Sequence, residues 1–163
     1  MKILRTVKHP SKVHVLGCVS SNGFGKIFCF VQNLTSYLMC KIYSQQLIYS
    51  AMQLYGEGEK EWSLYEDNHL KHMSKLCKAK RIKLSIDKIT TPAQSPDLNP
   101  IENVWAILKA NVYNRLPKTV VRLKRYIKEE WKKLSPYFAA RLVKSMPSRI
   151  KKLIKADGDC IMY

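Results

Sequence analysis

The stretch Pro92-Ala-Gln-Ser-Pro-Asp-Leu-Asn-Pro-Ile-Glu-Asn-Val-Trp105 joins a proline-rich loop to a helix. Its three prolines predict a loop over residues 90–100, because proline lacks the backbone N–H that helices and central strands use. From residue 101 onward, apolar side chains recur with the spacing of one helix face: Ile101, Val104, Trp105, Leu108 and Val112. The sequence therefore predicts a helix that begins at this loop and packs on a core.

Two carboxylates stand on elements that we expect to be rigid. Asp67 follows a short strand predicted over residues 62–66, and Glu102 lies in the first turn of the helix after the loop. Carboxylate oxygens are ligands that Mg²⁺ and Mn²⁺ prefer, and such ions promote phosphodiester chemistry. Each residue also has a structural interpretation, since Asp67 can form a turn with Asn68 and Glu102 a capping box with Asn99. The spacing alone leaves both alternatives open.

Charge is distributed unevenly along the chain. The 163 residues hold 29 Lys and Arg against 12 Asp and Glu, for a formal net charge of +17. Residues 1–56 contain no carboxylate, whereas the residues from 103 onward hold 15 Lys and Arg against four Asp and Glu. This excess predicts a polyanionic partner, with nucleic acid ahead of an acidic membrane surface. The basic residues that we expect to face nucleic acid are Lys71, Lys75, Arg122, Arg125, Lys128, Lys132 and Lys133.

The sequence has no feature of a secreted or membrane-spanning protein. No run approaches the roughly 18 to 20 apolar residues that a spanning helix needs, and the start of the chain lacks the apolar region of a signal peptide. Its five cysteines are odd in number and contain no Cys-x-x-Cys pair, which argues against a disulfide framework or zinc knuckle. We expect a nuclear or cytosolic protein.

The remaining patterns predict an α/β layer followed by a helical tail. A β-hairpin is expected over residues 13–31, with Asn22-Gly23 at the centre of a type I′ turn. A helix capped by Thr35 or Ser36 follows over 35–54. Beyond the strand at 62–66 we expect a helix over 74–81, a strand over 82–89, and helices over 119–134, 136–145 and 148–156.

Two further patterns have mainly structural interpretations. His69 and His72 could hold a metal by spacing, but two histidines without a third nearby ligand rarely do so. Trp105 and Trp131 lie on apolar helix faces, which predicts that both belong to the core.

Residues 92–105 resemble the third catalytic motif of the Tc-like transposases in the mariner superfamily. Glu66-Asp67-Asn68, with Lys71-His72 and Ser74-Lys75 after it, is similar to the second motif of that family. Between Asp67 and Glu102 lie 34 residues, which is the spacing typical of the Tc-like branch. The hairpin and the end of the chain extend the resemblance to nearly the full length.

The resemblance implies an RNase H-like fold in which three carboxylates bind two Mg²⁺ or Mn²⁺ ions. Those ions would drive strand cleavage at transposon ends and strand transfer by the freed 3′-hydroxyl. Asp67 matches the second carboxylate and Glu102 the third. The implied partners are DNA and a second copy of the chain, and no membrane is implied.

The sequence departs from the family pattern before the hairpin. The family's first Asp lies on a strand there, but this chain has no acid before Glu57, and the helix-turn-helix region is missing. We therefore expect residues 1–116 to form a partial catalytic domain that lacks its first strand, with an unpaired side on the sheet. Residues 117–163 would be a basic helical extension of it. The expected function is that of a transposase fragment inactive on its own, and the alternative is a domesticated non-catalytic DNA-binding or interaction module.

Overall fold

The computed structural model describes residues 12–56, 62–90 and 98–156. Within them the chain begins with the expected hairpin, whose strands are β1 (His14–Leu16), β2 (Val19–Ser20), β3 (Gly23–Phe24) and β4 (Phe28–Phe30). β1 pairs antiparallel with β4 and β2 with β3, so the hairpin is interrupted between its tip and its base. No ladder in the described segments joins this hairpin to another strand.

The tip of the hairpin differs from the predicted type I′ turn. Ser20 pairs with Gly23, so the two central residues are Ser21 and Asn22 rather than Asn22 and Gly23. Neither central residue has the positive φ that a type I′ turn requires, and Gly23 carries the unusual φ of +133°. The Asn22 amide instead donates to the carbonyl of Leu54 at 2.9 Å, which ties the tip to the following helix.

The predicted helix over residues 35–54 is present but contains a wider turn. It consists of α1 (Ser36–Ile42), the π-helical segment η1 (Tyr43–Leu47) and α2 (Ile48–Tyr55). Thr35 caps it as expected, because its hydroxyl accepts from the Leu38 N–H at 3.1 Å. A π turn shifts the register of the side chains that follow it, and such turns are frequent at functional sites. Here the segment begins at Tyr43, which is completely buried.

The segment after α2 contains less strand than the sequence indicates. The expected strand over 62–66 is reduced to one parallel bridge between Leu64 and Lys88. Helix α3 (Lys75–Lys83), capped by Ser74, extends two residues beyond its expected end. The predicted strand over 82–89 is wrong, because α3 closes through a turn in which Ser85 has a φ of +49°. The apparent alternation at Ile82 is misleading, since that side chain is 79% exposed.

The C-terminal helices agree closely with the sequence pattern. They are α4 (Ile101–Asn114), α5 (Val120–Lys132), α6 (Pro136–Lys144) and α7 (Met146–Lys155). Thr119 and Ser135 cap α5 and α6 with their hydroxyls. The last helix begins at Met146 rather than at the predicted residue 148, and Pro147 occupies its first turn, where proline is tolerated.

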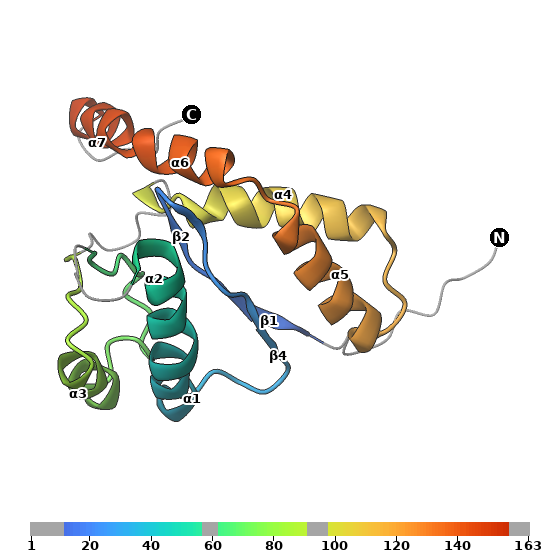
Figure 1. Ribbon diagram of the computed structural model, residues 1–163, viewed down its shortest axis with the longest axis horizontal. Coiled ribbons are helices and arrows are strands. Elements are labelled where there is room, and N and C mark those ends of the chain that lie inside the picture. The colour runs from blue at the N-terminus through green and yellow to red at the C-terminus, as the bar shows by residue number, and fades with distance from the viewer. Residues whose placement is uncertain (1–11, 57–61, 91–97, 157–163) are drawn as a thin grey trace.

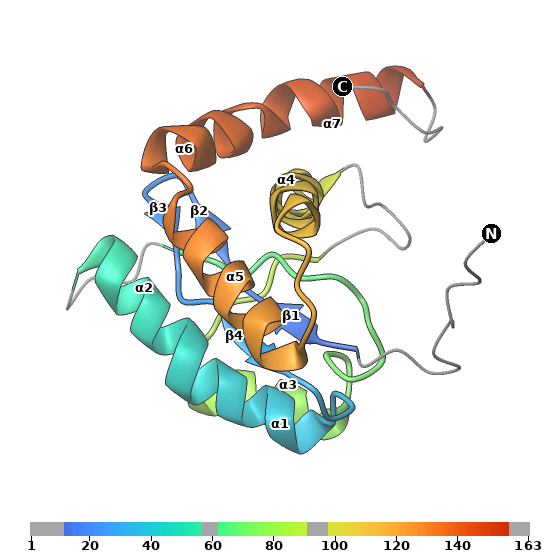
Figure 2. The ribbon, with the colours of Figure 1, turned by 90° about the vertical axis from the view of Figure 1, so that its right-hand side faces the viewer.

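The hairpin lies between two groups of helices, as Figures 1 and 2 show from perpendicular directions. Alternate strand residues point to opposite faces. Val15 and Cys29 pack on the cluster formed by α4, α5 and α6, which includes the predicted core residues Trp105 and Trp131. Leu16 and Phe28 pack on a second cluster formed by α1, η1 and α3. The Trp131 indole also donates to the carbonyl of Gly25 at 2.9 Å and thereby fixes α5 against the hairpin.

No helix in the described ranges is both long enough and apolar enough to cross a membrane.

Candidate functional site

Asp67 lies just beyond the Leu64–Lys88 bridge, at the position predicted for a catalytic carboxylate. Its side chain is 63% exposed, and Oδ1 lies 2.7 Å from Nδ1 of His72. The same oxygen accepts from the backbone N–H of His69 at 3.3 Å, which is the turn contact that the structural interpretation predicts. The two interpretations are therefore compatible, because Asp67 closes a local turn and still presents its carboxylate to solvent.

His72 lies five residues after Asp67, in the same segment before α3, and is buried. It is 8% exposed, and although Nδ1 approaches Asp67, neither ring nitrogen has an aligned hydrogen bond within the described residues. The His69 and His72 rings lie 5.5 Å apart and are tilted. Across the described ranges, no group of three or more His, Cys, Asp or Glu side chains is arranged to hold a metal ion. The two histidines therefore have no third ligand of this kind beside them in the described part of the chain.

The most strongly bonded carboxylate of this region is Glu66, which the sequence did not single out. It is 9% exposed and accepts from the Tyr43 hydroxyl at 2.8 and 3.0 Å. Nη1 of Arg81 donates to the same carboxylate at 2.9 Å, and the Lys88 ammonium lies 3.7 Å from it. Burial, together with the negative charge of Glu66, raises the pKa of Tyr43 far above its usual range. The phenol therefore remains protonated and serves as a donor.

This buried network holds the backbone on both sides of Asp67. Glu66 immediately precedes Asp67, and Arg81 also donates to the carbonyl of His72 at 2.9 Å. Tyr43 comes from the π-helical segment and Arg81 from α3, so two separate helices fix one short loop. Arg81 follows the buried Cys77 by four residues and so lies on the same helix face, which accounts for its burial.

Glu102 lies in the first turn of α4, as predicted, and is exposed. The capping box proposed as its structural alternative is absent. Pro100 occupies the N-cap position, and the Asn99 side chain accepts from the Ile101 N–H at 3.4 Å. The Glu102 N–H donates to the backbone carbonyl of Asn99 at 3.1 Å. The Glu102 side chain therefore does not cap the helix, so the structural alternative does not explain a glutamate at this position.

Asp67 and Glu102 belong to different parts of the fold. Asp67 lies in the loop before α3, whereas Glu102 lies in the first turn of α4. Glu102 is fixed through its helix, because Val104 and Leu108 are buried in the core cluster. The next residue, Asn103, accepts from Nη2 of Arg149 on α7 at 2.9 Å, so the C-terminal helix also holds the start of α4.

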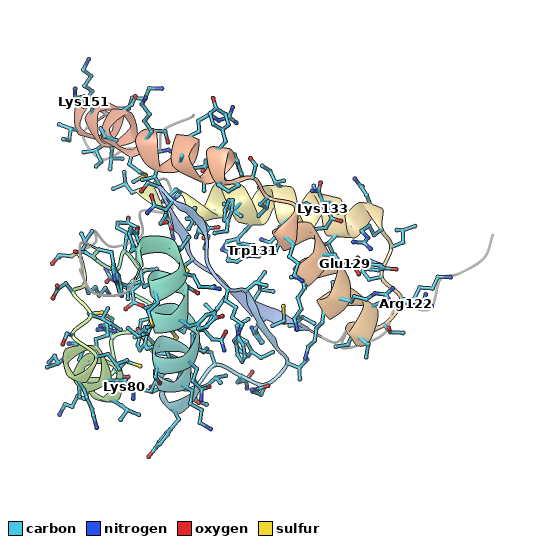
Figure 3. All side chains as sticks on the ribbon, viewed as in Figure 1. Lys80, Arg122, Glu129, Trp131, Lys133 and Lys151 are labelled. Carbon is cyan, nitrogen blue, oxygen red and sulfur yellow. The ribbon has the colours of Figure 1, made fainter. Side chains whose placement is uncertain are left out.

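The residues predicted to face nucleic acid are all exposed, but they are not electrostatically equivalent. Arg125 lies 3.5 Å from Glu129, and Lys133 lies 2.6 Å from Glu130. Figure 3 shows Arg122, Glu129 and Lys133 distributed along α5. Arg122, Lys128 and Lys132 have no such ion pair among the described residues. Lys71 and Lys75 precede and begin α3, away from α5.

The sequence model of one protein family, described as DDE superfamily endonuclease, matches residues 2–124. The chain belongs to this family. Its described fold also resembles the catalytic domain of Mos1 transposase with a TM-score of 0.85 at 15% identity, over 96% of this chain and 80% of that one. The fold is therefore the RNase H-like fold expected from the sequence, with many helices around a small sheet.

Curated relatives of this DDE family chain are Tc-like transposases. The Tc3 transposase of Caenorhabditis elegans is 37% identical over 108 residues, which is 65% of this chain and 33% of that protein. The Tc1 transposase of Caenorhabditis elegans is 27% identical over 97% of this chain and 57% of its own length. The chain thus spans between a third and a little over half of the relatives it matches. A Mos1 paired-end complex with Mn resembles it with a TM-score of 0.87 at 15% identity, over 99% of this chain and 48% of that one.

Proposed function

We propose that this chain is part of a Tc-like transposase and contributes to DNA strand cleavage at transposon ends and to strand transfer. One observation carries the proposal. The two motif carboxylates, Asp67 and Glu102, are both exposed on fixed elements of a chain whose fold matches a transposase catalytic domain. Family membership and the Tc-like relatives support the same activity class.

Divalent cations are the cofactor that this proposal requires. The donor chemistry of Asp67 and Glu102 fits Mg²⁺ or Mn²⁺, because both are exposed carboxylates and these hard cations prefer oxygen ligands. The number of ligands does not fit a complete site, since the described residues gather no set of three suitable side chains. When bound, such ions would activate water and stabilise the leaving oxygen. Mos1 structures with Mn and with Mg support this choice of ions.

We further propose that the 163 residues on their own do not cleave DNA. The family pattern requires a third carboxylate from a strand before the hairpin, and residues 1–56 contain no Asp or Glu. Without that ligand, Asp67 and Glu102 would hold a cation weakly and would not position two. Residues 1–116 then act as a partial catalytic domain and residues 117–163 as its basic extension.

DNA is the proposed partner, in contact with the basic surfaces of α3, α5 and the C-terminal helices. The relatives named transposases and the Mos1 complexes with transposon ends support DNA binding. We also propose that the chain acts as a homo-oligomer and in the nucleus, where its substrate lies.

The second candidate function is a domesticated DNA-binding or interaction module without catalysis. The lack of a three-ligand cluster in the described residues favours it, together with the uncompensated cations of the C-terminal half. Under this alternative, Asp67 and Glu102 are relics, and substituting them leaves every DNA-related property unchanged.

A plasmid assay tests the proposed DNA binding and the proposed inactivity of the isolated chain. The purified chain is incubated with supercoiled DNA and Mg²⁺ or Mn²⁺, beside Asp67→Ala and Glu102→Ala. We expect duplex binding that weakens steeply with salt, as counterion release requires, and no nicking by any of the three proteins. Nicking by the parent chain that Asp67→Ala abolishes would contradict the proposed inactivity. Failure to bind duplex DNA even at low salt would contradict the proposed function itself.

A further inference from the structure

A cavity of about 300 Å³ lies where the start of α4 meets α6 and α7. Its lining includes three cationic side chains, Arg141, Arg149 and Lys152, and the polar side chains of Asn103 and Ser148. None of the described residues that line it is acidic. The charged side chains that line it among the described residues are therefore all cationic, as a site for an anion requires.

Arg149 is built into the wall of this cavity. It is 5% exposed, and it donates from Nη2 to Oδ1 of Asn103 and from Nε to the Ser145 hydroxyl, both at 2.9 Å. The Ser145 hydroxyl in turn donates to the carbonyl of Leu142 at 2.6 Å. These bonds fix the guanidinium before any ligand arrives, which lowers the entropic cost of binding.

The other two cations are exposed at the same cavity. Arg141 and Lys152 form no ion pair within the described residues, in contrast to Arg125 on α5 and Lys133 at its C-terminal end. Residues 136–155, which form α6, α7 and their junction, contain no Asp or Glu at all. The positive potential of this cavity is therefore not offset by acids on α6 or α7, and α4 contributes one acid, Glu102, next to Asn103.

We propose that this cavity binds a phosphate group of a DNA strand. Arginine, lysine, hydroxyl and amide groups are the side chains that most often contact phosphate oxygens, and the charged ones form the strongest bonds. The DNA source rests on the proposed function, whereas the phosphate chemistry follows from the cavity itself. Because Asn103 directly follows Glu102, a phosphate held here would guide its strand past the motif carboxylate at the start of α4.

A matched pair of double variants tests the site. Arg141→Gln with Lys152→Gln removes two cavity cations, and Lys144→Gln with Lys151→Gln removes two cations from the same helices outside the cavity. Lys151 lies at the α7 end of the molecule in Figure 3. All four side chains are exposed, so both variants should fold, which far-ultraviolet circular dichroism and thermal unfolding will check.

Inorganic phosphate is the first probe, titrated at constant ionic strength and followed by the NMR signals of the Asn103 amide and the Arg149 Nε–H. We expect saturable shifts in the parent chain and in the Lys144/Lys151 variant. In the Arg141/Lys152 variant the affinity should fall by about tenfold or more, because charge-assisted hydrogen bonds are removed. Absence of shifts in the parent chain, or equal shifts in both variants, would overturn the phosphate site.

Duplex DNA is the second probe, and it identifies the source of the phosphate. The slope of log affinity against log salt should fall more in the Arg141/Lys152 variant than in its control, by about one unit for each DNA phosphate that the variant no longer neutralises. Phosphate binding without this difference would overturn the assignment to DNA and indicate a site for free phosphate. If the parent chain binds phosphate but no DNA, the proposed function fails while the phosphate site stands.

Discussion

Arg81 and Glu66 form an almost fully buried ion pair, with Nη1 of Arg81 located 2.9 Å from Oε1 of Glu66. The pair is joined by the Tyr43 hydroxyl, which also accepts from Nη1 of Arg81 at 2.8 Å. Burying charges is costly unless they are paired and hydrogen-bonded. This network satisfies that condition directly beside Asp67, so we regard it as the structural support of the candidate site.

Removing the Tyr43 hydroxyl should destabilise the fold measurably. Tyr43→Phe deletes a buried donor to Glu66, and the loss of a hydrogen bond to a charged group costs about 1 to 3 kcal/mol. Tyr37→Phe provides the control, because Tyr37 is 75% exposed. Urea unfolding followed by circular dichroism measures both variants. Equal stability of Tyr43→Phe and the parent chain would show that the Tyr43 hydroxyl contributes nothing to the fold.

Breaking the ion pair should cost more than removing the phenol. Arg81→Met leaves Glu66 as a buried carboxylate without its guanidinium partner, for which about 3 to 5 kcal/mol is typical. The same unfolding experiment measures the loss. A smaller effect than that of Tyr43→Phe would contradict the assignment of Arg81 as the main partner of Glu66.

Gly17 should not tolerate a side chain. An added Cβ would lie 2.7 Å from Cη2 of Trp131 and 3.2 Å from Cη2 of Trp105, whose rings stack 5.4 Å apart. Because the core offers no space, Gly17→Ala should cost about 1 to 3 kcal/mol. It should also change the near-ultraviolet circular dichroism of the indoles. Combining it with Trp131→Phe should cost less than the sum of the two changes, and strict additivity would argue against this contact.

The lowered pKa of Glu130 should make the free energy of unfolding depend on pH in the acidic range. Its hydrogen bond from Lys133, aided by Arg115, lowers its pKa below the ordinary value of 4.5. A carboxyl whose pKa is lowered in the folded state stabilises the protein above its unfolded pKa. That stabilisation is lost as the pH falls through the folded pKa. Glu130→Gln should therefore be less stable than the parent at neutral pH, and the difference should shrink below pH 4.5. A difference that is constant with pH would contradict this.

The basic residues of α5 should contribute unequally to DNA binding. Arg122 and Lys128 have no ion pair within the described ranges, whereas Lys133 is held by Glu130. Arg122→Gln with Lys128→Gln should reduce the salt slope of duplex binding by about two units if both contact phosphates. Lys133→Gln should change the slope less. An equal reduction per residue would show that the ion pair does not restrict Lys133.

Most of the helical structure could be predicted from the sequence because local signals agree there. Thr35, Ser74 and Thr119 all cap helices with their hydroxyls, and the apolar face of α4 is buried as its spacing predicts. The strand predicted over 82–89 failed because apolar alternation cannot distinguish a strand from a helix end followed by a turn. The positive φ of Ser85 marks the turn that ends the helix, and a serine in the sequence does not indicate that conformation.

Sequence reasoning could identify the two motif carboxylates of the candidate site but not the residues that hold them in place. Asp67 and Glu102 were singled out by the resemblance to the second and third catalytic motifs of the family, and the structure shows both carboxylates exposed. The Tyr43–Glu66–Arg81 network and the Arg149–Asn103 bond could not be predicted, because each joins residues distant in sequence. The π turn at Tyr43 adds to this difficulty, since it changes which side chains share a helix face.

The most direct test of the proposed site is metal-directed cleavage of the protein backbone. Fe²⁺ takes the place of Mg²⁺, and with ascorbate and peroxide it cuts the chain near its ligands. If Asp67 and Glu102 bind a common cation, fragments should end near both residues, and excess Mg²⁺, Asp67→Asn or Glu102→Gln should abolish both cuts together. Cuts near only one of the two carboxylates, or cuts that survive these substitutions, would contradict the shared site.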